Sequence, residues 1–248
     1  MDERKSLAVD ALFADLVRAG ESRSQVRTVL AGVVDEQVLI AVLRRAVPVA
    51  ALEDVVSRFP WSERPRVLAR VVTNPRAAQG LALRLVPALY WRDLAEVAAT
   101  ARLSGAVRAR AESQLGDGLA SMRLGDRVTL ARLATPAILT TLLADDEPRV
   151  VESALQNPRL REEDLVTALK REDASPAVLR AAAESPRWAT NYSVRLSLVL
   201  QPRTPLALAL AQISSLVPRD LRRAAEDPRV RPLLRAAAQA VLDRTATD

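Results

Sequence analysis

Residues 178–188 read VLRAAAESPRW, and 42 residues further on, at 220–230, the chain reads DLRRAAEDPRV. A longer match contains this one. Residues 47–115 align without a gap with residues 174–242, at an offset of 127, and 20 of the 69 positions are identical. Because three steps of 42 make about 127, the sequence predicts imperfect repeats of about 42 residues.

The repeated segments have the composition and spacing of α-helices. Apolar residues recur at intervals of three and four, as in residues 149–155, and the whole chain holds only seven glycines. A polar residue followed by proline marks the segment boundaries: Asn74-Pro75, Glu147-Pro148, Asn157-Pro158, Ser185-Pro186, Gln201-Pro202 and Asp227-Pro228. Since proline fits the first turn of a helix, we expect each of these prolines to open one, with the preceding residue as its cap. The predicted fold class is all-α.

The repeat divides the chain into three predicted parts of one continuous domain. Residues 1–46 fit the repeat poorly and read as amphipathic helices at about 5–18, 23–33 and 35–46, which we interpret as an N-terminal helical cap. Residues 47–242 form the helical array, and residues 243–248 a short, frayed tail. The register is least certain at 104–130, where Leu115-Gly116-Asp117-Gly118 stands in place of an Asn-Pro-Arg turn.

The best-matching segments are Asp227-Pro228-Arg229-Val230-Arg231, followed by Leu233 and Ala236-Ala237-Ala238, and Asp146-Glu147-Pro148-Arg149-Val150. They resemble the Asp-x-x-Pro-x-Val-Arg turn of the HEAT-like and armadillo-like helical repeat superfamily, which includes bacterial leucine-rich repeat variant proteins. The resemblance covers residues 47–242 and implies a right-handed α-solenoid. The iron–sulfur cluster of some leucine-rich repeat variant proteins is not implied, because this chain has no cysteine.

Composition removes most catalytic chemistry from consideration. Without histidine or cysteine the chain lacks the commonest acid–base group, the usual zinc ligands and a thiolate nucleophile. Neither a Walker A loop nor a Gly-x-Gly-x-x-Gly loop is present. The acidic clusters at 145–147 and 162–164 fall at predicted helix starts, where carboxylates stabilise the helix dipole. We therefore expect no enzyme activity, no cofactor and no metal.

The charge and apolar patterns indicate the cellular location of the protein and the class of its binding partner. The longest apolar stretch, residues 205–211, is far below the roughly 20 residues of a membrane-spanning helix, and residues 1–5 do not resemble a secretory signal. We expect a cytoplasmic protein without membrane contact. The net charge is +6, supplied almost wholly by arginine. A basic chain favours nucleic acid as a partner, although the alanine- and arginine-rich bias of the whole sequence weakens that argument.

One arginine recurs after the boundary prolines. It is found at Arg76, Arg149, Arg159, Arg187, Arg203 and Arg229. In the first turn of a helix a cation opposes the dipole, so each of these arginines should have a partner. Either they bond to carboxylates or carbonyls of the adjacent repeat, or they form anion-binding sites with helix N-termini. We favour the first interpretation.

The aromatic residues are few. Trp61 and Trp188 occupy equivalent positions, which favours packing between repeats. Trp91 and Asp93 faintly resemble the tryptophan and aspartate that HEAT-like alkylpurine DNA glycosylases place around a flipped base. However, Arg92-Asp93 recurs as Arg219-Asp220 without its tryptophan, which favours a structural role.

Three functional hypotheses follow. The first is a non-catalytic scaffold that binds a protein or peptide partner. The second is a nucleic-acid or ribosome binder whose repeated arginines contact backbone phosphates. The third is the glycosylase. Arginines in one exposed stripe would favour nucleic acid, whereas arginines paired within the protein would favour the scaffold.

Overall fold

The computed structural model describes residues 3–245 and contains only helices and their connections, with no strand among those residues. The all-α prediction is confirmed. The described chain forms two compact units that meet between Ala120 and Ser121, and each unit is described by itself.

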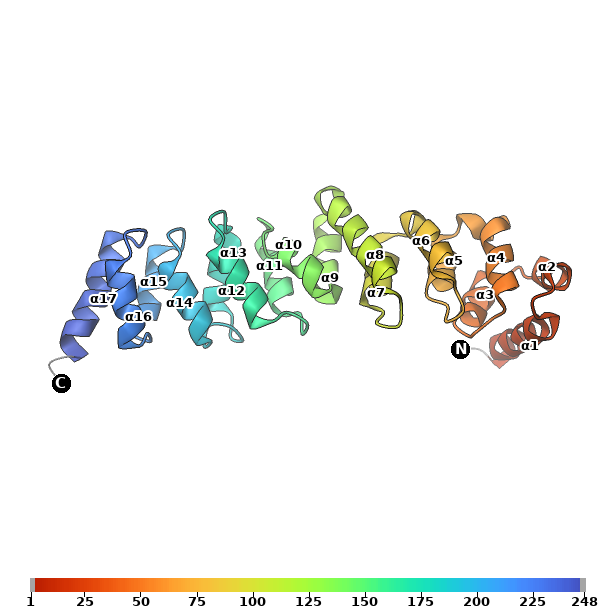
Figure 1. The fold of residues 1–248 in the computed structure, drawn as a ribbon, viewed down its shortest axis with the longest axis horizontal. Helices are drawn as coiled ribbons and strands as arrows, with labels where there is room; N and C mark the ends of the chain where they lie inside the picture. The colour runs from red at the N-terminus through yellow and green to blue at the C-terminus, as the bar shows by residue number, and fades with distance from the viewer. Residues whose placement is uncertain (1–2, 246–248) are drawn as a thin grey trace. The chain divides into compact units, whose positions relative to one another are not determined.

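The first unit is a succession of short helices (Figure 1). Its elements are α1 (Glu3–Ala19), α2 (Arg23–Ala31), α3 (Glu36–Leu43), α4 (Val49–Ser57), η1 (Trp61–Glu63), α5 (Pro65–Val72), α6 (Gln79–Leu85), η2 (Val86–Ala88), α7 (Trp91–Ala99) and α8 (Gly105–Gly118). Helices α1, α3, α5 and α7 pack one against the next, while α2 packs on α4 and α6 on α8. Most helices of this unit therefore lie against the helix two places further along the chain, and α1 on α2, α5 on α6 and α7 on α8 also pack as consecutive pairs.

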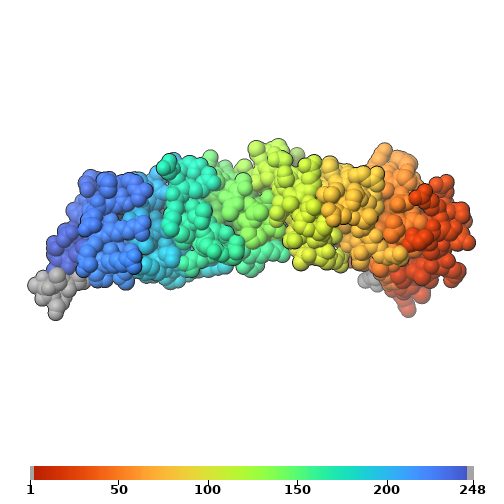
Figure 2. Space-filling view, viewed as in Figure 1, coloured from red at the N-terminus to blue at the C-terminus, as the bar shows by residue number. Residues whose placement is uncertain are grey.

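The second unit repeats this arrangement (Figure 1). A short 3-10 helix, η3 (Leu119–Ser121), spans the boundary, and it is followed by α9 (Leu124–Leu133), α10 (Pro136–Leu142), α11 (Pro148–Leu155), α12 (Glu162–Lys170), α13 (Pro176–Glu184), α14 (Tyr192–Leu200), α15 (Leu206–Ile213), α16 (Pro218–Glu226) and α17 (Pro232–Thr245). Helices α10, α12, α14 and α16 form one packed series, α9, α11 and α13 a second, and α15 packs on α17. Within each unit the surface colours in Figure 2 change in chain order, as this nearest-neighbour packing requires.

The sequence match at an offset of 127 pairs helix with helix. It aligns α4, α5, α6, α7 and α8 with α13, α14, α15, α16 and α17 in the same order. The packed pairs correspond as well, since α5 packs on α7 and α14 on α16, and α7 packs on α8 and α16 on α17.

The 42-residue step, by contrast, spans three helices. It relates α13, which begins at Pro176, to α16, which begins at Pro218. Helix α13 packs on α11, whereas α16 packs on α14, so the two matching helices belong to different packed series. Alternate helices α9, α11, α13, α15 and α17 begin at 124, 148, 176, 206 and 232, which is a spacing of 24 to 30 residues.

Each helix buries one apolar stripe and exposes the opposite face. On α5, Val67, Leu68, Val71 and Val72 are buried while Arg66 and Arg70 remain partly accessible. Such stripes build the apolar core, since in repeat folds each segment can bury its apolar face only against its neighbours. One buried cluster joins α1 to α6, and a second joins α14 to α17.

The ends of the chain agree with the sequence only in part. Helices α1, α2 and α3 lie where three N-terminal helices are predicted. The predicted tail starts at 243, but α17 continues to Thr245, and residues 246–248 lie outside the described part. No helix within residues 3–245 combines the length and apolarity needed to cross a bilayer.

Candidate binding surfaces

Most of the Pro-Arg pairs lie in turns, which corrects the prediction that their prolines open helices. Pro75, Pro158, Pro186, Pro202 and Pro228 each follow the end of a helix, and only Pro148 occupies a first helical position. The prolines that do open helices are Pro65, Pro136, Pro148, Pro176, Pro218 and Pro232. In four of these turns, at Asn74, Asn157, Gln201 and Asp227, the side-chain oxygen of the residue before proline accepts the backbone N–H of the arginine instead of capping a helix N-terminus.

That polar side chain is a buried amide in three of the turns. Asn157 is 1% exposed, and its Nδ2 donates to the carbonyls of Ala131 and Ala134, at 2.8 and 3.2 Å. Its Oδ1 accepts the backbone N–H of Arg159 at 2.8 Å. The two carbonyls lie at the end of α9, where a helix leaves its last C=O groups without internal partners. Asn157 therefore caps the C-terminus of the neighbouring helix.

The same contact recurs at the other two amides. Asn74, after α5, donates from Nδ2 to the carbonyls of Leu43 and Arg45 at 2.7 and 2.8 Å. Gln201, after α14, donates from Nε2 to the carbonyls of Leu169 and Arg171 at 2.7 and 2.8 Å. Each amide thus ties the end of one helix to the end of the helix two places before it. We call Asn74, Asn157 and Gln201 the amide clamps.

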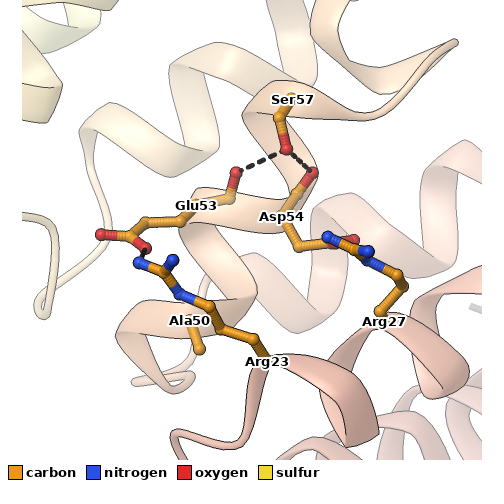
Figure 3. A pocket seen from close by; sticks show the side chains of 6 residues that line it. All are labelled: Arg23, Arg27, Ala50, Glu53, Asp54 and Ser57. Carbon is orange, nitrogen blue, oxygen red and sulfur yellow. Dashed lines mark hydrogen bonds and ion pairs between the residues drawn. The ribbon is translucent and has the colours of Figure 1, made fainter.

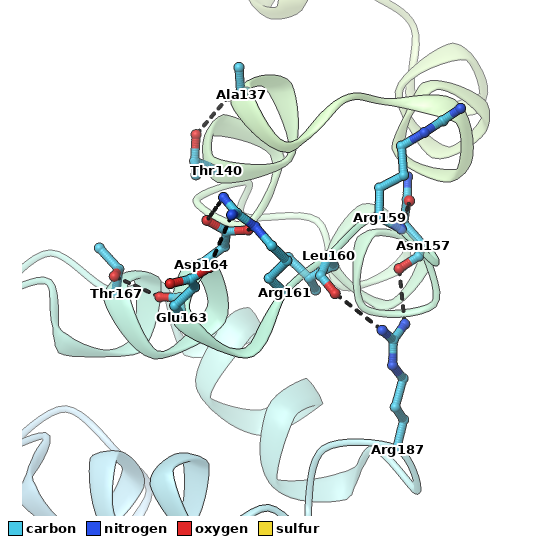
Figure 4. Close-up of polar contacts among 10 residues, drawn as sticks. All are labelled: Ala137, Thr140, Asn157, Arg159, Leu160, Arg161, Glu163, Asp164, Thr167 and Arg187. Atoms are coloured by element: carbon cyan, nitrogen blue, oxygen red, sulfur yellow. Dashed lines mark hydrogen bonds and ion pairs between the residues drawn. The ribbon is translucent and has the colours of Figure 1, made fainter. Parts of the chain in front are cut away.

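The arginines of these turns bond to the protein itself. Arg159 donates to the carbonyl of Leu133 at 2.9 Å, and Arg203 to that of Glu172 at 3.4 Å. Arg187 donates to the carbonyls of Asn157 and Leu160 at 2.9 and 3.1 Å (Figure 4). Its guanidinium also lies over the ring of Trp188. Trp188 itself is buried, and its indole N–H donates to the carbonyl of Leu155.

Two of the arginines pair with carboxylates. Arg76 contacts Glu21 at 2.9 Å, and Glu21 also accepts the N–H groups of Val49 and Ala50 at the start of α4. Arg229 bonds to Asp227 two residues earlier, at 2.8 and 3.1 Å. This pairing, with the backbone N–H of Arg229, lowers the pKa of Asp227 to about 2.

Arg149 alone of the six occupies the first turn of a helix, α11, as predicted. Its side chain is exposed, and within residues 3–245 it makes no hydrogen bond or ion pair.

The turn expected near residue 115 lies earlier in the chain. Leu115-Gly116-Asp117-Gly118 is the last part of α8, and Thr100-Ala101-Arg102 forms the turn after α7. Arg102 aligns with Arg229 at the offset of 127, and it donates to the carbonyl of Thr73 at 2.7 Å. The sequence signal was weak because this turn has lost both its proline and its amide.

Trp91 and Asp93 lie in the first turn of α7, near the ion pair of Arg70 and Glu96. Trp91 stacks under Arg92, whose guanidinium carbon is 5.0 Å from the ring centre. Arg70 of α5 forms two bonds of 2.5 Å to Glu96. Burial raises the pKa of the Asp93 carboxyl, and the positive charge of Arg70 offsets part of this rise. At the aligned position of α16, Asp220 accepts the Tyr192 hydroxyl at 2.5 Å. Asp93 of α7 therefore interacts with α5, and Asp220 of α16 with α14, which is in each case the helix two places earlier.

A small cavity of about 190 Å³ between α2 and α4 holds charged groups that already bond to one another (Figure 3). Arg23 pairs with Glu53 at 2.9 Å and Arg27 with Asp54 at 3.5 Å. The hydroxyl of Ser57 donates to the carbonyls of Glu53 and Asp54, so it is engaged in its own helix.

A more open cavity of about 470 Å³ lies along α16, and the sequence interpretation missed it. Its lining residues are Arg219, Asp220, Arg222, Arg223, Glu226 and Asp227. In the aligned helix α7, the positions of Arg222 and Arg223 hold Ala95 and Glu96. This difference between the aligned sequences of α7 and α16 was the signal that could have identified the surface.

An apolar groove of about 500 Å³ lies between α1 and α3, and its apolar lining is flanked by Lys5 and Arg44. No cluster of three or more His, Cys, Asp or Glu within residues 3–245 is arranged to hold a metal ion.

Comparison with known proteins gives no family. No model of a known protein family matches the chain, and no curated protein sequence matches it significantly.

Proposed function

We propose that this chain is a non-catalytic cytoplasmic scaffold that binds a protein or peptide partner on a stack of helices. In this proposal the stack is a right-handed, HEAT-like α-solenoid with a sequence period of about 42 residues, capped by residues 1–46. The packing of most helices on the helix two places before them supports the proposal, because packing between neighbouring repeats is typical of solenoids.

One observation carries the choice of partner. Five of the six repeated arginines direct their donors at carbonyls or carboxylates of the protein itself. A phosphate backbone needs a track of available cations, since its binding energy comes mainly from neutralised phosphates. The repeated arginines do not supply that track, which favours the scaffold over a nucleic-acid binder.

The test is a mobility-shift titration of the whole chain with duplex DNA and structured RNA, beginning near about 50 mM salt. We expect no complex with either. A complex that weakens steeply as salt is added would overturn the proposal in favour of nucleic-acid binding.

The glycosylase alternative has a separate test. Incubation with alkylated duplex DNA should release no base, because Trp91 stacks on Arg92 and Asp93 lies beside the Arg70–Glu96 pair. Base release by the natural chain that is lost in Asp93→Asn would show that the protein is an enzyme.

A further inference from the structure

Helix α16 carries three exposed arginines that line one open cavity. Arg219, Arg222 and Arg223 are exposed, and within residues 3–245 none of them makes a hydrogen bond or ion pair. We call these three side chains the α16 arginines.

Arg219 occupies a position that is unfavourable in the protein alone. Arg219 lies in the first turn of α16, where a cation opposes the helix dipole. Arg219 and Arg223 are four residues apart, so two like charges are neighbours on one helix face. A bound anion would relieve both effects.

The acidic groups nearest to them are largely occupied. The Asp220 carboxylate accepts the Tyr192 hydroxyl, and the Asp227 carboxylate is bonded by the backbone N–H and guanidinium of Arg229. Arg223 adds only a smaller electrostatic contribution at Asp227. Asp227 is neutralised by Arg229, whereas Asp220 and Glu226 keep their charge, so the three α16 arginines face two carboxylates and the surplus is a single positive charge.

From this charge complementarity, and resting on the proposed function, we infer that the α16 arginines dock an acidic segment of the protein partner. Guanidinium groups bind carboxylates in paired hydrogen bonds, which suits Asp- and Glu-rich peptides. Tyr192 and Val217 are 36% and 48% exposed at the same end of α16, and they offer an apolar contact beside the charges. The nearby Glu226 and the small extent of the group disfavour a phosphate backbone, which presents evenly spaced charge over many residues.

In the aligned helix α7 the corresponding surface is neutralised. Position 96 holds a glutamate that pairs with Arg70, and Arg92 is stacked on Trp91. Of these two aligned helices, only α16 exposes such a group, which indicates a role beyond the packing that both copies share.

The experiment measures fluorescence polarisation of the whole chain with a labelled peptide of glutamates and leucines, and with the same peptide carrying glutamine in place of glutamate. The test variant is the triple substitution Arg219→Gln, Arg222→Gln and Arg223→Gln. The matched control is Arg123→Gln, Arg132→Gln and Arg180→Gln. It removes the same charge from exposed positions of the same unit, and within residues 3–245 these three side chains make no hydrogen bond or ion pair.

We expect the glutamate peptide to bind saturably and the glutamine peptide to bind much more weakly. The α16 triple variant should weaken binding about tenfold or more, while the control triple changes it less than about twofold. Circular dichroism should show that the α16 variant is folded and no less stable, because a like-charge pair has been removed.

Equal weakening by both triple variants would mean attraction by net charge alone and would overturn the inference, as would no binding of the glutamate peptide. The scaffold proposal would survive either result, because a partner could use another surface. Duplex DNA that displaces the peptide, and binds less well to the α16 variant, would overturn both proposals.

Discussion

At the scale of single residues, the most consequential contacts are made by the amide clamps. An amide is suited to this position because it offers two N–H donors to two carbonyls and one oxygen to a backbone N–H. A carboxylate offers only acceptors, so Asp227, which precedes proline in the turn after α16, bonds to Arg229, and within residues 3–245 it makes no bond to an earlier helix end.

Substitution of a clamp should therefore destabilise the fold. Asn157→Ala leaves the carbonyls of Ala131 and Ala134 without these donors in a buried site. We expect the free energy of unfolding to fall by about 1–3 kcal/mol, measured by urea denaturation. Gln239→Ala, which removes an exposed amide on α17, is the control and should change it by less than about 0.5 kcal/mol. Equal losses in the two variants would show that burial of the amide is unimportant.

The Asp227–Arg229 pair makes a prediction about pH. The pKa of Asp227 is lowered to about 2, first by the guanidinium and then by the backbone N–H of Arg229. A lowered carboxyl pKa means that the pair stabilises the fold above the unfolded pKa near 4, and that this stabilisation is lost as pH falls toward 2.

Arg229→Gln should raise the pKa of Asp227 toward its usual value while the backbone bond keeps it somewhat below. A carboxyl titration of Asp227 by NMR spectroscopy measures this directly. A midpoint near 4 in the natural chain would show that the pair is not formed in solution.

At the scale of elements, neighbouring helices are joined by one or two specific polar contacts in addition to apolar packing. Arg70 and Glu96 join α5 to α7, Tyr192 and Asp220 join α14 to α16, and the amide clamps join helix ends. These contacts connect helices two places apart, so they fix which surfaces of adjacent helices face each other.

The Arg70–Glu96 contact can be measured by a double-mutant cycle. With Arg70→Gln and Glu96→Gln singly and together, we expect a coupling free energy of about 0.5–1 kcal/mol, because the pair is bidentate but Glu96 is 46% exposed. The coupling should shrink at high salt, since exposed charges are screened. Absence of coupling at low salt would mean that the two helices are held together by apolar packing alone.

At the scale of the whole molecule, the packing of helices mainly on their near neighbours in the described chain has a thermodynamic consequence. Stability in such a chain is a sum of local terms and nearest-neighbour terms, so damage stays local. The two buried clusters, one in α1 to α6 and one in α14 to α17, belong to different units.

Hydrogen exchange followed by mass spectrometry tests this. Leu221→Ala, in the second cluster, should speed exchange in α14 to α17 and leave α1 to α6 unchanged. Leu39→Ala, in the first cluster, should do the reverse. A uniform increase along the chain in both variants would show that the protein unfolds as one cooperative body.

The sequence by itself determined the helices and their correspondence. Apolar spacing and the offset of 127 residues are local and one-dimensional signals, and they identified the pairing of α4 to α8 with α13 to α17. Sequence also singled out the Pro-Arg turns, since their residues are adjacent in the chain.

Only the tertiary structure decided what those turns do. An asparagine before proline is equally suited to cap the helix that follows or to bond elsewhere, and the choice depends on carbonyls 23 to 32 residues away. The availability of the α16 arginines likewise depends on which nearby carboxylates are already bonded. Those carboxylates and their partners are brought together by the fold, so the sequence alone does not show which charges are left unpaired.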